Sequence, residues 1–426
     1  MLAKFLFFYI INGRKRINLS ENCLMKKILC LICLFSIGFY SCAVRNYLSS
    51  KSDLNEDRVF YGQMINKGQN AGWFNVPAHL VRNTEHLAIY IQTKFHKDYK
   101  GEQNVSLYAL NKLAQEFDYY YTSMTNIYGT HSDIDGNGKI IILLMDINVN
   151  KGAGSQVLGY FNPMDMHGYN ESEILYMDIS NANNKTDNAI GTIIHEFQHL
   201  INYSYVMSGA RNEMDSWLNE ALSESTSILF NKATAESRIS EFNKINYYCF
   251  YTWDIPTNIS NNNKNNTHVN YPSASVFMNW LYQKNNRNES VFRNIAHSSE
   301  IEDYKKVLGA AGYGNDWQGL LINWIDGIKK GQVNGAKINN WTSTWTTTAY
   351  LYPGALVYGN SKIHVNPSTD LSDNPQAIRA QIYEDNFIIT SRSADNTANE
   401  NNIYLQTTQK PKYIDLVFDK DGKIKK

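Results

Sequence analysis

Residues 191–203 read GTIIHEFQHLINY, a largely apolar stretch that carries two histidines and one glutamate. A Thr-Asp pair at 186–187 favours a helix start, and apolar side chains then recur at helical intervals, at Ile190, Ile194, Phe197 and Ile201. The pattern predicts a helix from residue 188 to about residue 205. On such a helix His195 and His199 are four residues apart and share one face.

Two histidines at this spacing form half of a metal site. Side chains at i and i+4 lie about 5 to 6 Å apart at Cβ, so both imidazoles can bind one zinc ion. Glu196 lies beside the first histidine, where its carboxylate can reach a metal-bound water. A catalytic zinc also needs a third protein ligand and an open fourth position. The alternative is a buried helix that carries isolated polar residues and binds no metal. The zinc site requires a third ligand from elsewhere in the chain.

A second predicted helix, DSWLNEALSESTSILF at 215–230, supplies a candidate for that ligand. Its apolar and small residues share one face, and Glu220 and Glu224 lie four residues apart. Carboxylates on a mostly apolar helix are costly to bury unless positive charge lies opposite them. A zinc ion held by two histidines would supply that charge.

HEFQH followed by NEALSE resembles the thermolysin-type glutamate zincins, whose second helix carries an N-E-x-x-S-acid pattern. The resemblance implies a role for each matching position: His195 and His199 bind zinc, Glu196 is the general base, Glu220 is the third ligand, and Glu224 supports His195. This chain carries Glu at 224 where those enzymes usually carry Asp, so its carboxylate has a longer arm.

A longer resemblance, over roughly residues 80–285, is to the hyicolysin-like zinc peptidases. It is carried by the segments DIDGNGKI, GYF, ESEILYMD, HEFQHLIN, WLNEALSE and YPSASVFMNWLYQ. It implies an α+β, zincin-like metallopeptidase domain with an N-terminal mixed sheet, an active-site helix and a helical C-terminal subdomain. The metzincin pattern fails, because Asn202 replaces its glycine and Tyr205 replaces its third histidine.

Peptide hydrolysis also needs a donor for the oxyanion that develops at the scissile carbon. Tyr271 and His268 both precede a predicted helix in THVNYPSASVFMNWLYQ. Related glutamate zincins carry a tyrosine before a helix that starts with small residues, and this resemblance favours Tyr271. His268 is the alternative, and either residue could instead be an ordinary polar residue of a surface loop.

The segment HSDIDGNGKI resembles the front half of a calcium-binding loop, through Asp133, Asp135, Asn137 and Gly138. The twelfth position of an EF-hand loop must supply a bidentate glutamate, and here it is Leu144. We therefore exclude an EF-hand, interpret the segment as a tight turn before a strand, and assign no calcium.

ESEILYMDIS, residues 171–180, predicts a strand directly before the histidine helix. In the glutamate zincins that this chain resembles, an edge strand flanks the cleft. The resemblance implies that residues 171–180 bind an extended peptide through backbone hydrogen bonds, with Tyr176 and Met177 as candidate substrate-binding residues. The alternative is a central strand that is paired on both sides.

The segment MKKILCLICLFSIGFYSC, residues 25–42, is typical of a bacterial lipoprotein signal. Residues 1–41 would be a leader whose true start is Met25, and Cys42 would carry lipid. Residues 42–70 would then be a lipidated, polar tether. The apolar run is too short to span a bilayer comfortably, although an uncleaved anchor is the alternative. We expect an exported lipoprotein of the cell envelope or surface, or one released from it.

Forty basic and 40 acidic residues give a formal net charge of zero, which argues against nucleic acid as a partner. We expect a zinc metallopeptidase domain over residues 71–335 and a small β-rich module over residues 340–426. The predicted function is that of a monomeric zinc endopeptidase acting on polypeptides. A zinc hydrolase of non-peptide amides and a non-catalytic binding lipoprotein or adhesin are the alternatives.

Overall fold

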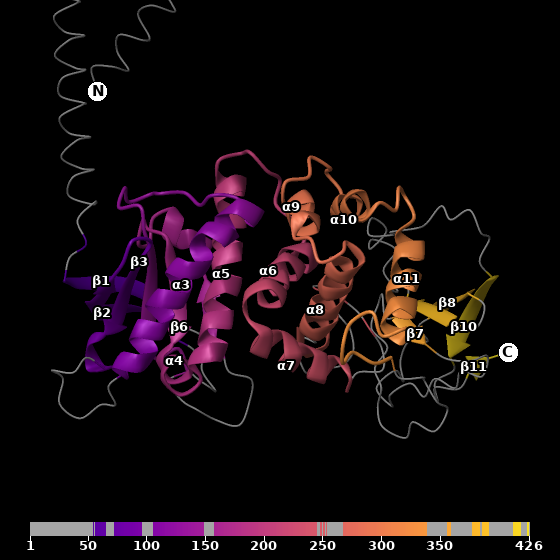
Figure 1. Cartoon of the computed structure of the whole chain (residues 1–426), viewed down its shortest axis with the longest axis horizontal. Coiled ribbons are helices and arrows are strands. Elements are labelled where there is room, and N and C mark those ends of the chain that lie inside the picture. The colour runs from indigo at the N-terminus through magenta and orange to yellow at the C-terminus, as the bar shows by residue number, and fades with distance from the viewer. Residues whose placement is uncertain are drawn as a thin grey trace, which may run out of the picture. The chain divides into compact units, whose positions relative to one another are not determined.

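The computed structural model in Figure 1 describes most of the chain between residues 54 and 338 and short strands after it. The described residues are 54, 56–64, 72–95, 105–148, 157–244, 248, 250, 251, 253, 267–338, 356–358, 377–383, 386–391, 412–418 and 424–425. The leader and Cys42 lie outside these residues, so cleavage and lipidation stay predictions. No helix within the described ranges is long and apolar enough to cross a membrane.

The N-terminal part is a six-stranded mixed sheet with the order β1-β2-β3-β4-β6-β5. Its strands are β1 (Asp57–Met64), β2 (Gly72–Asn83), β3 (Leu87–Gln92), β4 (Ile140–Met145), β5 (Gly159–Phe161) and β6 (Ile174–Asp178). The strands β3, β4 and β6 are parallel, whereas β1, β2 and β5 pair antiparallel to their neighbours. Every residue of β3, β4 and β6 is buried, as expected for parallel strands covered on both faces.

The strand β1 corrects the expected extent of the tether. Asp57–Met64 lies within the stretch 42–70 but pairs with β2 along its whole length. Phe60 is fully buried, and its ring meets that of Tyr90 edge-on at 5.0 Å between centroids. Mostly exposed or half-buried side chains on β1 explain why its sequence looks like a polar linker. The folded body therefore starts before residue 70.

The strand β6 is central, not an edge. It pairs with β4 on one side and with β5 on the other, so the prediction that residues 171–180 form the rim of a cleft is wrong. The short strand β5 (Gly159–Phe161) is the edge on this side of the sheet. The continuous apolar run of β6 is the pattern of a strand buried on both faces.

Nine α-helices lie in the part of the chain that the structure describes. They are α3 (Leu107–Tyr128), α4 (Ile179–Asn184), α5 (Thr186–Met207), α6 (Ser216–Phe230), α7 (Lys232–Phe242), α8 (Thr267–Lys284), α9 (Ser290–Ala296), α10 (Asp303–Ala311) and α11 (Trp317–Lys329). The predicted helix at 188–205 is confirmed as α5, two residues longer at each end. Short 3-10 turns, η1 (Thr93–Phe95) and η2 (Pro163–Met166), complete this part.

The helix α5 lies between the sheet and the helical subdomain, as Figure 1 shows. On one side it contacts β5 and β6, and on the other it contacts α6, which in turn packs on α7 and α8. Its apolar face joins the core through Phe197, whose ring lies 5.1 Å from that of Phe117 on α3. The histidine face of α5 is thereby turned toward α6.

Gly191 lets α7 start close to α5. A Cβ at this position would lie 2.4 Å from Thr234 Oγ1, which no real contact tolerates. Asn231, the residue that caps α7, accepts from the Thr234 N–H and donates through Nδ2 to the Asp187 carbonyl at 2.7 Å. The first turn of α7 is thus fixed on α5, and the rest of α7 extends over α6.

The C-terminal residues form a second, antiparallel sheet with the order β11-β10-β8-β9-β7. Its strands are β7 (Leu356–Tyr358), β8 (Ala377–Tyr383), β9 (Asn386–Ser391), β10 (Lys412–Phe418) and β11 (Ile424–Lys425). These strands agree with the β-rich texture of the sequence after residue 340. That they form a separate module stays a prediction, as do the domain boundaries.

Candidate active site

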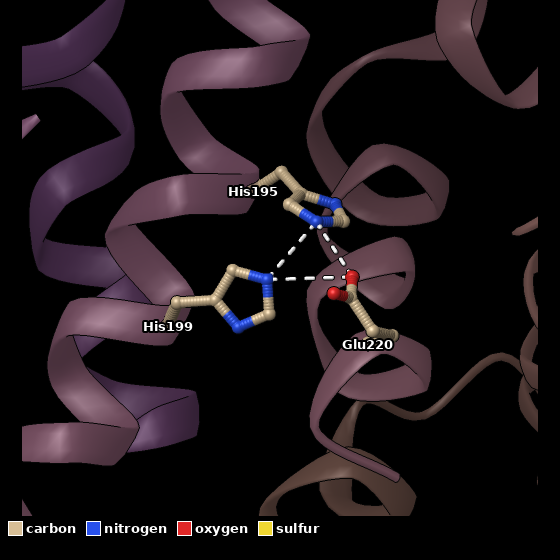
Figure 2. Close-up of side chains that lie close together, drawn as sticks. All are labelled: His195, His199 and Glu220. Atoms are coloured by element: carbon tan, nitrogen blue, oxygen red, sulfur yellow. Dashed lines mark hydrogen bonds and ion pairs between the residues drawn. The ribbon is translucent and has the colours of Figure 1, made fainter. Parts of the chain in front are cut away.

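Three donor atoms from two helices converge at one point. His195 Nε2 lies 3.2 Å from His199 Nε2 and 3.2 Å from Glu220 Oε2, and His199 Nε2 lies 3.4 Å from the same oxygen. Figure 2 shows both imidazoles of α5 pointing at the carboxylate of α6. The side chains are 13%, 12% and 19% exposed, so they line an accessible but largely buried position.

The donor set fits a zinc ion in kind and in spacing. Two imidazole nitrogens and one carboxylate oxygen are the protein ligands of a common type of catalytic zinc site. Tetrahedral coordination at about 2.0–2.1 Å places neighbouring ligand atoms about 3.3–3.4 Å apart. The observed separations of 3.2–3.4 Å match that geometry. Such a site leaves the fourth position open for water or substrate.

His199 and Glu220 change each other's pKa. Burial opposes a charge on His199, but the carboxylates of Glu220 and Glu196 outweigh it and raise the pKa of His199 to about 9. Burial likewise opposes ionisation of Glu220, and the charges and hydrogen bonds of the two histidines overcome it, lowering the pKa of Glu220. The position therefore favours an anionic carboxylate facing positive charge.

Glu196 is held by the backbone of the sheet. Its Oε2 accepts a hydrogen bond from the Phe161 N–H at 3.0 Å. Phe161 is the last residue of β5, so the edge strand orients the carboxylate that the sequence predicts to be the general base. This contact was not predicted, because a three-residue strand is too short to be recognised from its sequence pattern.

Behind His195 lies a charged pair. Glu224 Oε1 is 3.5 Å from His195 Nδ1, and the Glu224 side chain is only 1% exposed. Arg238 on α7 donates to both carboxylate oxygens, from Nε at 2.9 Å and from Nη2 at 2.7 Å. Arg238 was not identified in the sequence analysis. A basic residue one helix beyond a buried acidic pair is the signal that could have identified it.

Behind His199 lies a neutral pair. Ser223 Oγ is 3.1 Å from His199 Nδ1, and the Ser223 hydroxyl donates to Gln198 Oε1 at 2.5 Å. Ser223 and Gln198 are both fully buried. Neither was predicted to belong to the site, although both lie inside the quoted motifs.

Tyr271 lies at the site, inside a helix. The helix α8 starts at Thr267, four residues before Tyr271, and not after it as the sequence predicted. The Tyr271 ring lies 6.0 Å from that of His195, and the Arg238 guanidinium lies 4.9 Å from the Tyr271 ring centroid. Burial and the nearby carboxylates raise the pKa of Tyr271, so its hydroxyl keeps its proton and can donate. The side chain of His268 lies outside the described part of α8.

Tyr176 and Met177, predicted to bind substrate, belong to a strand that is paired on both sides. Both are fully buried in β6. The Tyr176 hydroxyl donates to the Tyr61 carbonyl at 3.1 Å, and its ring stacks on Tyr160 at 4.3 Å between centroids. The prediction of substrate contact is wrong for these two residues, because β6 is central and not exposed. They support the sheet under β5.

Comparison with known proteins points to the metallopeptidases. The chain is 25% identical to the neutral metalloprotease ShpI of Staphylococcus hyicus over 263 residues, which cover 58% of this chain and 56% of that protein. The chain thus spans about half the length of this curated relative. No protein-family model matches the chain. The similarity supports a relationship to metallopeptidases, while the metal and the role of each residue have to be argued from the site.

Proposed function

We propose that this chain is a zinc-dependent endopeptidase of the hyicolysin-like, glutamate zincin type. One observation carries the proposal: His195, His199 and Glu220 converge at 3.2–3.4 Å, the spacing of three ligands around one zinc ion. Glu196 lies beside them with one oxygen already fixed. The similarity to a neutral metalloprotease supports the same class of reaction.

The residues divide the chemistry among them. Zinc, when bound, would polarise the scissile carbonyl and make an attacking water more acidic. Glu196 Oε1 would take the proton of that water, because Oε2 is held by the Phe161 N–H. The same carboxyl group would then return the proton to the leaving amine. The Tyr271 hydroxyl would donate to the oxyanion.

The outer edge of β5 is the best candidate for binding an extended peptide. The Leu158 carbonyl accepts from the Asp178 N–H, so Leu158 and Tyr160 direct their backbone groups toward β6. Gly159 and Phe161 alternate with them and face the other way. The Phe161 N–H is already donated to Glu196, so the Gly159 N–H and C=O and the Phe161 C=O would pair with substrate, and this assigns to β5 the role first expected of residues 171–180.

The test of the reaction is the substitution Glu196→Gln. The amide keeps the size of the side chain but cannot accept the proton, so peptide hydrolysis should fall about 10²- to 10⁴-fold. Zinc content should stay at the wild-type level, because Glu196 is not a ligand. Glu236→Gln, on the exposed side of α7, is the matched control and should change neither quantity. Turnover at the wild-type rate in Glu196→Gln would exclude the proposed base.

A zinc hydrolase of non-peptide amides is the second candidate, because the same groups can attack any amide. The edge strand favours the endopeptidase, since backbone pairing rewards a peptide of several residues. A series from dipeptide to octapeptide separates the two functions. A kcat/KM value that rises with length supports the endopeptidase, and one that is independent of length supports the small-amide hydrolase. The non-catalytic binding lipoprotein is disfavoured by the full set of ligands and base.

We also propose that the protein is exported and held at a membrane by lipid on Cys42. The support is the sequence MKKILCLICLFSIGFYSC, with a charged start, an apolar run and a small residue before cysteine. Labelled palmitate should enter the wild type but not Cys42→Ser. Equal labelling of both proteins would exclude this site of attachment.

A further inference from the structure

A buried serine of α6 contacts two side chains of α5, the helix that carries both histidines. Ser223 Oγ on α6 lies 2.5 Å from Gln198 Oε1 and 3.1 Å from His199 Nδ1, both on α5. The Ser223 and Gln198 side chains are completely buried, so water cannot replace either partner. The two hydrogen bonds therefore have to be formed by the hydrogens of Ser223, Gln198 and His199 themselves, without water.

The direction of each hydrogen bond follows from counting those protons. A serine hydroxyl has one hydrogen, and an amide oxygen can only accept. The Ser223 hydrogen therefore points to Gln198 Oε1, and Ser223 presents a lone pair to His199. His199 Nδ1 must carry the hydrogen on that side. The lone pair of the neutral ring is then on Nε2, the atom that faces Glu220.

The opposite orientation of the amide would reverse the result. If the Gln198 NH₂ group donated to Ser223, the serine hydrogen would turn to His199 Nδ1, and the ring hydrogen would occupy Nε2. That form cannot bind a metal through Nε2. In the structure Oε1 faces Ser223 and Gln198 Nε2 has no hydrogen-bond partner among the described residues, so the choice between the two orientations rests on the lone pair that the proposed zinc site requires at His199 Nε2. The bond through Oε1 is the one polar interaction that explains a glutamine at this position.

We propose that Gln198 and Ser223 are positioning residues that direct the lone pair of His199 Nε2 to the metal. The inference rests on the proposed zinc site and extends it to two residues that touch neither metal nor substrate. It makes Gln198, which lies between the glutamate and the second histidine of HEFQH, a functional part of the motif. His195 receives the equivalent support from a carboxylate.

The test measures zinc affinity by competition with a chelator, without any assay of activity. Gln198→Met keeps the length of the side chain and removes the acceptor, and Ser223→Ala removes the hydroxyl. Each should weaken zinc binding about 10- to 100-fold, as is usual for partners of a ligating histidine. Ser225→Ala is the matched control, a buried serine on the same helix that bonds to Tyr128 instead, and should leave the affinity unchanged.

Two further variants separate positioning from packing. The double variant Gln198→Met with Ser223→Ala should lose no more affinity than either single change, because both act through one chain of hydrogen bonds. Gln198→Glu restores an acceptor and should recover most of the wild-type affinity. In cobalt-substituted protein, the exchangeable Nδ1 proton of His199 should shift or exchange faster in Gln198→Met, while that of His195 should not.

Several results would overturn the inference. They are wild-type zinc affinity in a folded Gln198→Met variant, additive losses in the double variant, or no recovery in Gln198→Glu. A wild-type protein that binds no zinc would instead refute the proposed function. The two failures are therefore distinguishable.

Discussion

The two histidines of α5 present the same atom to the same carboxylate but are supported by different chemistry. Behind His195 is Glu224, an almost fully buried anion to which Arg238 donates twice. Behind His199 is Ser223, a neutral hydroxyl that is itself directed by an amide. One support is an ion pair that needs a third helix, and the other is complete within α5 and α6.

The difference indicates what each support contributes. An anion behind a ligating imidazole raises its basicity, but burying the anion costs free energy unless a cation accompanies it. A neutral hydroxyl avoids that cost, and its only effect is to fix which ring nitrogen of the histidine carries the hydrogen. Damage to the support of His195 should therefore affect both stability and metal binding, whereas damage to that of His199 should affect metal binding alone.

The largest effect on zinc binding should come from removing a ligand itself. Without the ligand, the residues that support it no longer influence the metal. Wild-type protein should hold about one zinc per chain. His195→Ala and His199→Ala should both reduce this to background, because two remaining ligands do not make a stable site. Elemental analysis of purified protein measures it, with exposed His167 changed to alanine as the control. Unchanged zinc in either ligand variant would exclude the site.

Next in size is the effect of Tyr271→Phe, on the His195 side of the site. Loss of a donor to the oxyanion should lower kcat about 10²- to 10³-fold. Zinc content and KM should change little, since Tyr271 is not a zinc ligand and does not belong to β5, the strand proposed to bind the peptide. Steady-state kinetics with one peptide substrate decides it. A wild-type kcat in Tyr271→Phe would exclude Tyr271 as the oxyanion donor and leave His268 as the candidate.

Breaking the ion pair should produce the mixed defect that the comparison predicts. Arg238→Met leaves Glu224 as a buried carboxylate without its cation, so zinc affinity should fall about 10- to 100-fold. The unfolding free energy should fall by up to about 3 kcal/mol, because a buried carboxylate loses its cation. A larger fall is not expected, since the Arg238 side chain is 31% exposed. Adding Glu224→Gln should restore stability but not affinity. If Arg238→Met and Gln198→Met had the same effect on stability, the two supports would not differ as proposed.

The smallest effect concerns Asp165, a buried carboxylate that lacks the bidentate arginine of Glu224. It lies in η2, fully buried, where it accepts from Asn170 Nδ2 at 2.5 Å. Burial raises the pKa of Asp165 to about 7 from an ordinary value of 3.8. A raised folded pKa means that its stabilising contribution is full below about pH 4 and is lost as the pH rises through 7.

The substitution Asp165→Asn tests this pH dependence. Between pH 5 and pH 8 the wild type should lose about 2–3 kcal/mol of unfolding free energy that the variant keeps. Denaturant unfolding at the two pH values measures the difference. Asp187→Asn, an exposed residue bonded to Lys112, is the control and should follow the wild type. Parallel curves for wild type and Asp165→Asn would contradict the prediction.

The parts of the site that could be predicted from sequence are those carried by helical spacing. The two histidines, His195 and His199, are four residues apart, and so are Glu220 and Glu224. This spacing brings each pair to one face of its helix, α5 or α6. Residue type then indicates what such a face can bind. The α+β fold class was implied by the family resemblance over roughly residues 80–285, and the mixed sheet and the helices agree with it.

The parts that could not be predicted depend on tertiary packing. Arg238 reaches Glu224 because α7 starts against Gly191 and packs on α6, a tertiary arrangement that the spacing of residues within one helix does not give. The order of strands was likewise hidden, so β6 was taken for an edge although its buried residues Ile174–Asp178 are continuous and mostly apolar. The strand β1 was missed because most of its side chains are exposed or half-buried.

The hydrogen bond from Phe161 to Glu196 has a consequence for how the sequence can change. The donor is a backbone N–H, which every amino acid except proline supplies in the same place. Substitution at residue 161 therefore leaves the orientation of the carboxylate intact while it alters the side chain beside Tyr203, 5.9 Å away between ring centroids. In the proposed peptidase, substitutions at residue 161 would therefore change the surface next to the base, and with it the substrate preference, while the hydrogen bond that orients Glu196 is kept.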